Sequence, residues 1–173
     1  MTIKLSLTQL NTMPVDDFVR ALGGIFEHSA WVAERAAARR PFAGLDDLHA
    51  EMVRQIQDAG PEAQMKLICA HPELAGKAAV RGELTAESSS EQAGAGLDQC
   101  SPEEFARLNQ LNQAYREKFG FPFILAVKGY DRAGIIGQFE RRLALSPDEE
   151  TRESLQQIYR IGQFRLEALV TAD

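Results

Sequence analysis

The sequence has few of the residues that mark metal-binding, redox and disulfide-rich proteins. Its 173 residues include two cysteines and three histidines. Cys69 and Cys100 lack the paired CxxC spacing of zinc and redox sites, and so small a number predicts reduced, buried thiols rather than a disulfide framework. The histidines are spread without ligand spacing and no HExxH pattern occurs, so we predict no metal site.

Runs of positive charge and long apolar runs are missing as well. The formal net charge is −6 and no cluster of Lys and Arg occurs, which disfavours nucleic acid or an anionic membrane surface as a partner. No apolar run approaches the roughly 18 residues needed to span a bilayer. The first residues, MTIKLSLTQL, lack the apolar region of a signal peptide, and the final TAD is not a peroxisomal signal. We therefore expect a cytoplasmic protein with no membrane attachment.

What is present is ordinary globular composition. Hydrophobic residues make up 45% of the chain and charged residues 25%, which argues against a disordered or fibrous protein. The length suits one domain with a real core, and no repeat or linker interrupts it, so we predict a single domain over residues 1–173.

Apolar residues recur mostly at three- and four-residue spacing among Ala, Glu, Arg, Gln and Leu, which predicts an all-α, compact helical bundle. The clearest helix starts are SPEE from Ser101 and SPDE from Ser146, because each has an N-cap serine, a proline at the first helical position and a capping-box glutamate. The first of these helices should end near Phe119, before Gly120. Other helices are expected at about residues 15–22, 31–39, 45–59, 61–70 and 134–145.

One segment, near residues 121–128, breaks the helical pattern. The run from Phe121 to Val127 is apolar throughout, and a lone strand would have no ladder partner, so we predict a short buried extended segment. Its backbone N–H and C=O groups must be satisfied. Either a polar ligand satisfies them, or helix ends and water do.

Two motifs gather polar residues of catalytic type: HPELAGKAA from His71 and SSSEQAGAGL from Ser88. His71 precedes a proline, which places it just past a helix end, where it can face a cleft. Its near-neutral pKa suits general acid or base catalysis, and a capping or packing role is the alternative.

Glu91 also has two interpretations. Ser88-x-x-Glu91 is a capping box, which would begin a helix there. Alternatively, Ser88 and Gln92 lie one turn apart, as do Glu87 and Glu91, and would project hydrogen-bonding groups toward a ligand.

Arg165 lies within the last apolar helix, beside Phe164 and Leu166. It is either solvated, like most helical arginines, or buried, and burial would require an anionic partner. Near the N-terminus, Glu27, His28 and Trp31 are interpreted as a packing corner.

Taken together, the motifs resemble a known family. HPELAGK, SSSEQAGAGL, LNQAYREKFGFPFILAVKG and IGQFRLEALV, with EHSAW near the N-terminus, are similar in order and spacing to the 2-oxo-4-hydroxy-4-carboxy-5-ureidoimidazoline (OHCU) decarboxylases of urate catabolism. The resemblance covers nearly the whole chain. It implies an all-helical, cofactor-independent homodimer, a carboxy-lyase that converts its substrate into (S)-allantoin with stereospecific protonation.

The resemblance also implies site residues. It places the catalytic pair on His71 and Glu91, and substrate binding on Pro72, Ser88, Gln92, the backbone of Ile124 and Arg165. We hypothesise that His71 is the acid/base group and that Glu91 orients the substrate's hydroxyl or ureido group. Arg165 would hold an oxygen of the substrate by a charge-assisted fork.

Two alternatives stay open. The chain could be a helical binding or regulatory module for a purine-derived ureido compound. It could also be an enzyme of the same class that acts on another ureido or hydantoin acid, since the shape of a pocket is not readable from sequence.

Overall fold

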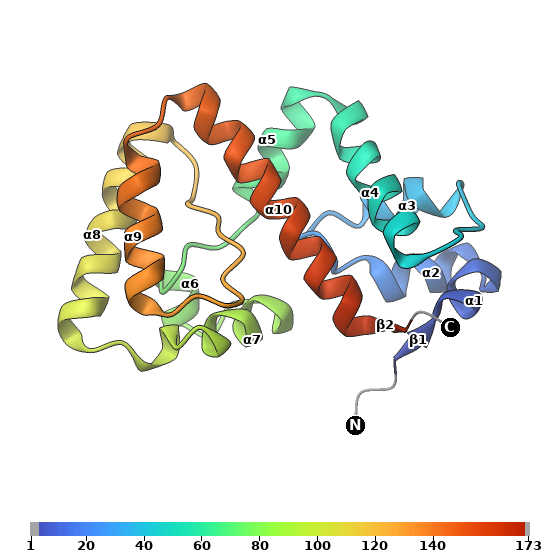
Figure 1. Cartoon of the computed structure of the whole chain (residues 1–173), viewed down its shortest axis with the longest axis horizontal. Helices are drawn as coiled ribbons and strands as arrows, with labels where there is room; N and C mark the ends of the chain where they lie inside the picture. Colours follow the sequence, from blue (N-terminus) through green and yellow to red (C-terminus); the bar gives the residue numbers. More distant parts are fainter. Residues whose placement is uncertain (1–3, 172–173) are drawn as a thin grey trace. The chain divides into compact units, whose positions relative to one another are not determined.

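The computed structural model describes residues 4–171, and helices make up most of them (Figure 1). This confirms the all-α prediction. The fold divides into two compact units: residues up to Ala70 together with those from Tyr159 onward, and residues His71–Ile158. The single domain over residues 1–173 stays a prediction.

The first unit contains five helices of the N-terminal region, the end of the last long helix and a short pair of strands, within the part of the chain that the structure describes. Helix α3 packs against α2 and α4, and α4 packs against α5. The elements are β1 (Leu5–Ser6), α1 (Leu7–Thr12), α2 (Val15–Leu22), α3 (Trp31–Ala37), α4 (Leu45–Ala59), α5 (Pro61–Cys69), the C-terminal part of α10 (Pro147–Leu169) and β2 (Val170–Thr171).

Close packing in the first unit depends on a glycine of α10. A Cβ atom at Gly162 would lie 2.7 Å from two ring carbons of the buried Phe26. Only a residue without a side chain allows this approach. At the chain ends, β1 and β2 pair in parallel, with Leu5 opposite Val170 and Ser6 opposite Thr171, a pairing that the sequence did not predict.

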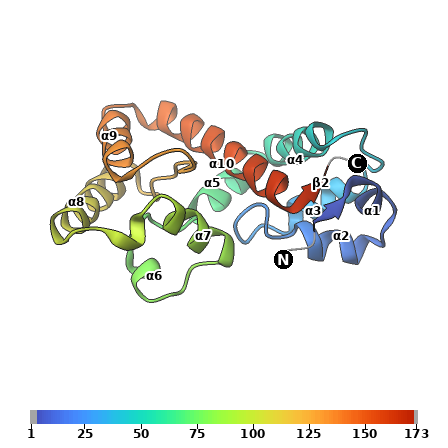
Figure 2. The same ribbon diagram turned by 60° about the horizontal axis from the view of Figure 1, so that its bottom comes forward.

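The second unit is built around α8 and α9, which pack side by side (Figures 1 and 2). Its elements are α6 (Lys77–Val80), α7 (Ala86–Gly94), the 3₁₀ turn η1 (Leu97–Gln99), α8 (Pro102–Phe119), α9 (Arg132–Leu143) and the N-terminal part of α10. Its aromatic core includes Tyr115, Phe123 and Phe139, and the rings of Phe123 and Phe139 stack with centroids 3.7 Å apart.

The predicted helix starts at Ser101 and Ser146 are confirmed. Ser101 Oγ accepts from the N–H of Glu104 at 3.1 Å, and Glu104 Oε1 accepts from the N–H of Ser101 at 3.0 Å. Ser146 and Glu149 make the same reciprocal pair at 3.2 and 2.8 Å. Helix α8 ends at Phe119 and is capped by Gly120, whose φ of 80° is in the left-handed region that glycine adopts easily.

The buried extended segment is also confirmed. Residues 122–127 have no regular secondary structure, and Phe123, Ile124 and Ala126 are each at most 3% exposed. The segment therefore crosses the core of the second unit without a strand partner.

The prediction that the cysteines are buried was wrong. Both thiols are free, but Cys69 is exposed and Cys100 is partly exposed. Leu67 and Ile68 form the buried side of the last turn of α5, so the next position along the helix faces outward.

Candidate active site

His71 lies where the sequence predicted, directly after a helix end. Helix α5 ends at Cys69 with Ala70 as its C-cap, and Pro72 disfavours continuation of the helix. The side chain of His71 is 7% exposed. A titratable imidazole is thus held in a largely buried position at the start of the second unit.

Two buried amide side chains fix the loop that His71 begins, residues 71–76. Gln92 of α7 accepts the N–H of Ala75 at 3.0 Å and donates to the carbonyl of Glu73 at 3.4 Å. Asn112 of α8 donates to the carbonyl of Leu74 at 2.9 Å. Three successive residues of the loop are therefore bound through their backbone groups.

The same loop carries an ion pair and an unusual backbone conformation. Glu73 pairs with Arg116 of α8 at 3.1 Å, one turn beyond Asn112. Ala75 has a φ of 51°, which costs an L-residue about 1–2 kcal/mol. The bond from its N–H to Gln92 helps to hold this conformation, so the loop has a defined shape.

Helix α7 carries the second motif, but it begins earlier than the capping box predicted. Its N-cap is Thr85, whose hydroxyl accepts from the N–H of Ser88. The capping interpretation of Ser88 and Glu91 was therefore wrong, because Thr85 offers the same hydroxyl one turn earlier. Ser88 and Gln92 are each 5% exposed, so both face inward from one side of the helix, while Glu91 between them is partly exposed.

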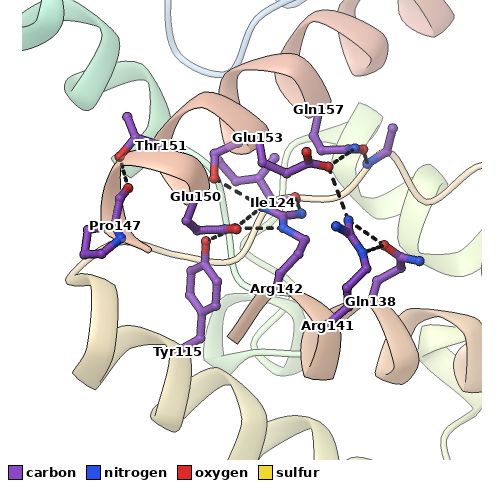
Figure 3. Close-up of polar contacts among 12 residues, drawn as sticks. Tyr115, Ile124, Gln138, Arg141, Arg142, Pro147, Glu150, Thr151, Glu153 and Gln157 are labelled. Atoms are coloured by element: carbon purple, nitrogen blue, oxygen red, sulfur yellow. Dashed lines mark hydrogen bonds and ion pairs between the residues drawn. The ribbon is translucent and has the colours of Figure 1, made fainter. Parts of the chain in front are cut away.

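The backbone of Ile124 is bound on one side only. Its carbonyl accepts a hydrogen bond from the guanidinium of Arg142 (Figure 3). Within residues 4–171, no acceptor is found for its N–H. Two residues on, the N–H of Ala126 donates to Gln157 at 3.0 Å. Buried side chains therefore satisfy the carbonyl of Ile124 and the N–H of Ala126. The sequence had suggested helix ends and water, or a ligand, as the partners.

Arg165 belongs to the first unit, where it is buried and paired. Its Nη2 lies 2.9 Å from Glu27 Oε1, and its Nη1 donates to the carbonyl of Gly24 at 3.2 Å. The anionic partner that burial required is therefore Glu27, so the packing corner predicted there includes a buried ion pair. The other predicted site residues lie in the second unit, so the substrate contact of Arg165 depends on the resemblance.

Sequence reasoning missed Asn112, Arg142 and Glu150. Glu150 of α10 is fully buried, and its Oε1 accepts from Arg142 and from the hydroxyl of Tyr115. Burial and this carboxylate raise the pKa of Tyr115, so the phenol stays protonated and donates. A signal was present: Ile135, Phe139 and Arg142 share one helical face, which places Arg142 on the buried side of α9.

Within residues 4–171, no group of three or more His, Cys, Asp or Glu side chains could hold a metal ion. Nor is any helix in that range both long and apolar enough to cross a membrane.

Comparison with known proteins agrees with these features. A family model described as OHCU decarboxylase matches residues 11–167. The chain is 43% identical over 163 residues to 2-oxo-4-hydroxy-4-carboxy-5-ureidoimidazoline decarboxylase of Haloferax volcanii. This match covers 94% of this chain and 95% of that protein. It is 40% identical over 166 residues to the uric acid degradation bifunctional protein PucL of Bacillus subtilis, covering 96% of this chain and 33% of that protein.

A solved structure is similar as well. The crystal structure of (S)-allantoin synthase matches with a TM-score of 0.75 and 28% sequence identity, over 96% of this chain and 54% of that chain. The family model and the Haloferax relative both span almost the whole chain. This protein therefore belongs to the OHCU decarboxylase family.

Proposed function

We propose that this protein decarboxylates 2-oxo-4-hydroxy-4-carboxy-5-ureidoimidazoline and releases (S)-allantoin. The observation that carries the proposal is that the buried His71 begins a loop bound by Gln92 of α7. The same helix also carries Ser88 and Glu91. An acid/base group and a carboxylate are thereby supplied by a fixed loop and the helix that binds it, in a chain of this family.

The substrate can supply its own electron sink. Its ring C=N adjoins the carbon that carries the carboxylate, so the electrons of the breaking C–C bond move into the ring as carbon dioxide leaves. The enol-like intermediate becomes allantoin when a proton reaches the ureido-bearing carbon. Delivery from one face gives the S enantiomer, which makes stereochemistry the signature of enzymatic turnover.

The roles of individual residues follow from this chemistry. His71 moves the proton, and Glu91 orients the hydroxyl or ureido group of the substrate and accepts its proton. The N–H of Ile124 donates to the ring, and Pro72 and Ser88 line the approach. Because the oxygen of Gln92 and one of its N–H groups bind the loop, we propose that its remaining N–H binds the substrate amide.

Four further elements of the proposal depend on the family resemblance. Arg165 holds an anionic or carbonyl oxygen of the substrate. The enzyme needs no cofactor, works as a homodimer and acts in the cytoplasm. Sedimentation of the purified protein tests the dimer directly, and a mass of one chain at micromolar concentration would contradict it.

The experiment that tests the function follows the configuration of the product. The substrate is generated in situ from urate, and circular dichroism is recorded with and without the protein. Uncatalysed decay gives racemic allantoin, so a protein-dependent signal of the S enantiomer supports the decarboxylase. Racemic product at the uncatalysed rate, from folded protein, would favour a binding module, and turnover of a different ureido acid would change the substrate.

The same assay tests His71. His71→Asn should lower kcat by about 100- to 10,000-fold, the usual contribution of a general acid or base. His49→Gln is the matched control, because His49 bonds a backbone carbonyl, that of Tyr159 at 2.8 Å, within the first unit. A folded His71→Asn variant with full activity would exclude His71 as the catalytic group.

A further inference from the structure

We propose that Arg142 is a positioning residue for this reaction, which acts by fixing the backbone at Ile124, whose N–H meets the substrate. The inference rests on the proposed function, because it assigns a purpose to the backbone contact of Ile124. It concerns a buried polar network in which Arg142, Glu150 and Tyr115 (Figure 3) are joined by Ser154.

Arg142 uses its guanidinium to join the extended segment to α10. Its Nε donates to Glu150 Oε1 at 2.7 Å, and its Nη2 donates to the same oxygen and to Ser154 Oγ at 3.2 Å. Its Nη1 donates to the carbonyl of Ile124. Arg142, Glu150 and Ser154 are all fully buried, so the network has a single defined geometry rather than a solvated one.

The network fixes the segment at more than one point. The guanidinium carbon of Arg142 lies 4.4 Å from the ring centroid of Phe123, the residue before Ile124. The N–H of Ala126 is bound by Gln157, which itself donates to Glu153 at 3.1 Å. Ile124 therefore lies between two anchored neighbours, Phe123 and Ala126. Its own carbonyl accepts from the charged guanidinium of Arg142, a stronger donor than a neutral group.

A structural role alone explains this arrangement poorly. A buried ion pair seldom stabilises a fold more than apolar side chains of the same volume would. The segment has no strand partner, so without Arg142 nothing in the network would set the direction of the Ile124 carbonyl. The N–H of Ile124 lies in the peptide plane before it and its carbonyl in the plane after it, and φ and ψ join the two planes. Arg142 acts on both sides, because it binds the carbonyl and packs on the ring of Phe123, and together these contacts restrict the direction of the N–H.

The test uses three variants of the network. Arg142→Lys keeps the charge but loses the fork, Glu150→Gln removes the charge that orients the guanidinium, and Tyr115→Phe removes one hydrogen bond with little change in volume. Arg107→Lys is the control for an arginine, since Arg107 forms an exposed pair with Glu140 at 2.9 Å that also joins α8 to α9. Leu108→Ala is the control for lost stability in the buried face of α8.

Arg142→Lys should lower kcat/KM by about 100-fold, the loss that accompanies a displacement of about 1 Å at a reacting group. Its enzyme-dependent product should also contain a measurable share of the R enantiomer, because a loosely held ring can take the proton on either face. Tyr115→Phe should show the same two changes to a smaller degree. Both controls should give (S)-allantoin with unchanged enantiomeric purity.

The outcomes separate the two proposals. If Arg142→Lys and Glu150→Gln fold less stably but keep kcat/KM and enantiomeric purity, as Leu108→Ala is expected to, the network is structural and the positioning role is wrong. If they fail to fold, the Tyr115→Phe variant decides by the same two measurements. If the unaltered protein gives only racemic product, the proposed function itself fails.

Discussion

Asn112 shows how one amide can determine the shape of the loop that His71 begins. It is 3% exposed, and its Nδ2 donates to the carbonyl of Leu74, three residues after His71. Arg116, one turn later on α8, binds Glu73 of the same loop. A single face of α8 therefore contributes to the geometry around His71 without supplying a predicted catalytic group.

Replacement of Asn112 tests this role. Asn112→Ala leaves the buried carbonyl of Leu74 without its donor, so the free energy of unfolding should fall by about 1–3 kcal/mol in urea titration. Asn109→Ala is the matched control, because Asn109 is exposed and bonds only a carbonyl of its own helix, at 2.9 Å. The control should change the free energy of unfolding by less than about 0.5 kcal/mol. Equal effects of the two substitutions would contradict an anchoring role.

At the scale of the element, the helix caps are the features that the sequence predicted best. Serine followed by proline and glutamate defined the starts of α8 and α10, since these residues act through local hydrogen bonds that need no tertiary context. The predicted start of α7 was three residues too late, because Thr85 and Ser88 are both acceptable N-caps and only the folded structure shows which one is used.

The capping box of α8 predicts a pH dependence. A backbone hydrogen bond from Ser101 and, after it, the bond from Arg132 lower the pKa of the Glu104 carboxyl below the ordinary value of a glutamate. A lowered folded pKa means that the carboxylate stabilises the fold above its ordinary pKa, and that this stabilisation is lost as the pH falls through the folded pKa.

Glu104→Gln should therefore flatten the decline of unfolding free energy that acidification causes. A glutamine can still close the box, as Gln9 does in α1. Glu103→Gln, in the same first turn, removes a carboxylate outside the box and serves as control. Urea titrations from about pH 7 to about pH 3 compare the three proteins. If Glu104→Gln keeps the full acid dependence, the capping carboxylate does not contribute it.

The structure brings predicted site residues together where they lie in short motifs, and their roles stay a prediction. Residues from His71 to Gln92 are close in sequence, and the structure joins their loop and helix through Gln92. Arg142 and Glu150 were missed because an arginine after another arginine, and a glutamate in a first helical turn, have the pattern of solvated residues. Their burial depends on the path of a segment that has no periodic pattern of its own.

At the scale of the whole molecule, α10 contributes to both units. Residues of this helix up to Ile158 belong to the second unit and residues from Tyr159 belong to the first. The backbone hydrogen bonds of a continuous helix form cooperatively across such a boundary. We therefore keep the prediction that residues 1–173 unfold as one domain.

Trp31 allows a test of this prediction, because it is the chain's one tryptophan and lies in α3 of the first unit. Its fluorescence reports on that unit, whereas far-ultraviolet circular dichroism reports on all helices. One domain predicts coincident urea midpoints for the two signals. Separate midpoints would show that the two units unfold independently.

The parallel pairing of β1 with β2 brings the first and last strands of the described chain side by side. Leu5 and Ser6 lie beside Val170 and Thr171, and Lys4 Nζ donates to the carbonyl of Glu167 at 3.2 Å. A flexible peptide between Thr171 and Lys4 can therefore close the described part of the chain into a ring. New ends can open in the exposed turn at residues 81–83, between α6 and α7, where no helix is cut. These two changes together make a circular permutant, in which the helices follow a different order along the chain but keep the same fold. Such a permutant would keep every contact described for the loop of His71.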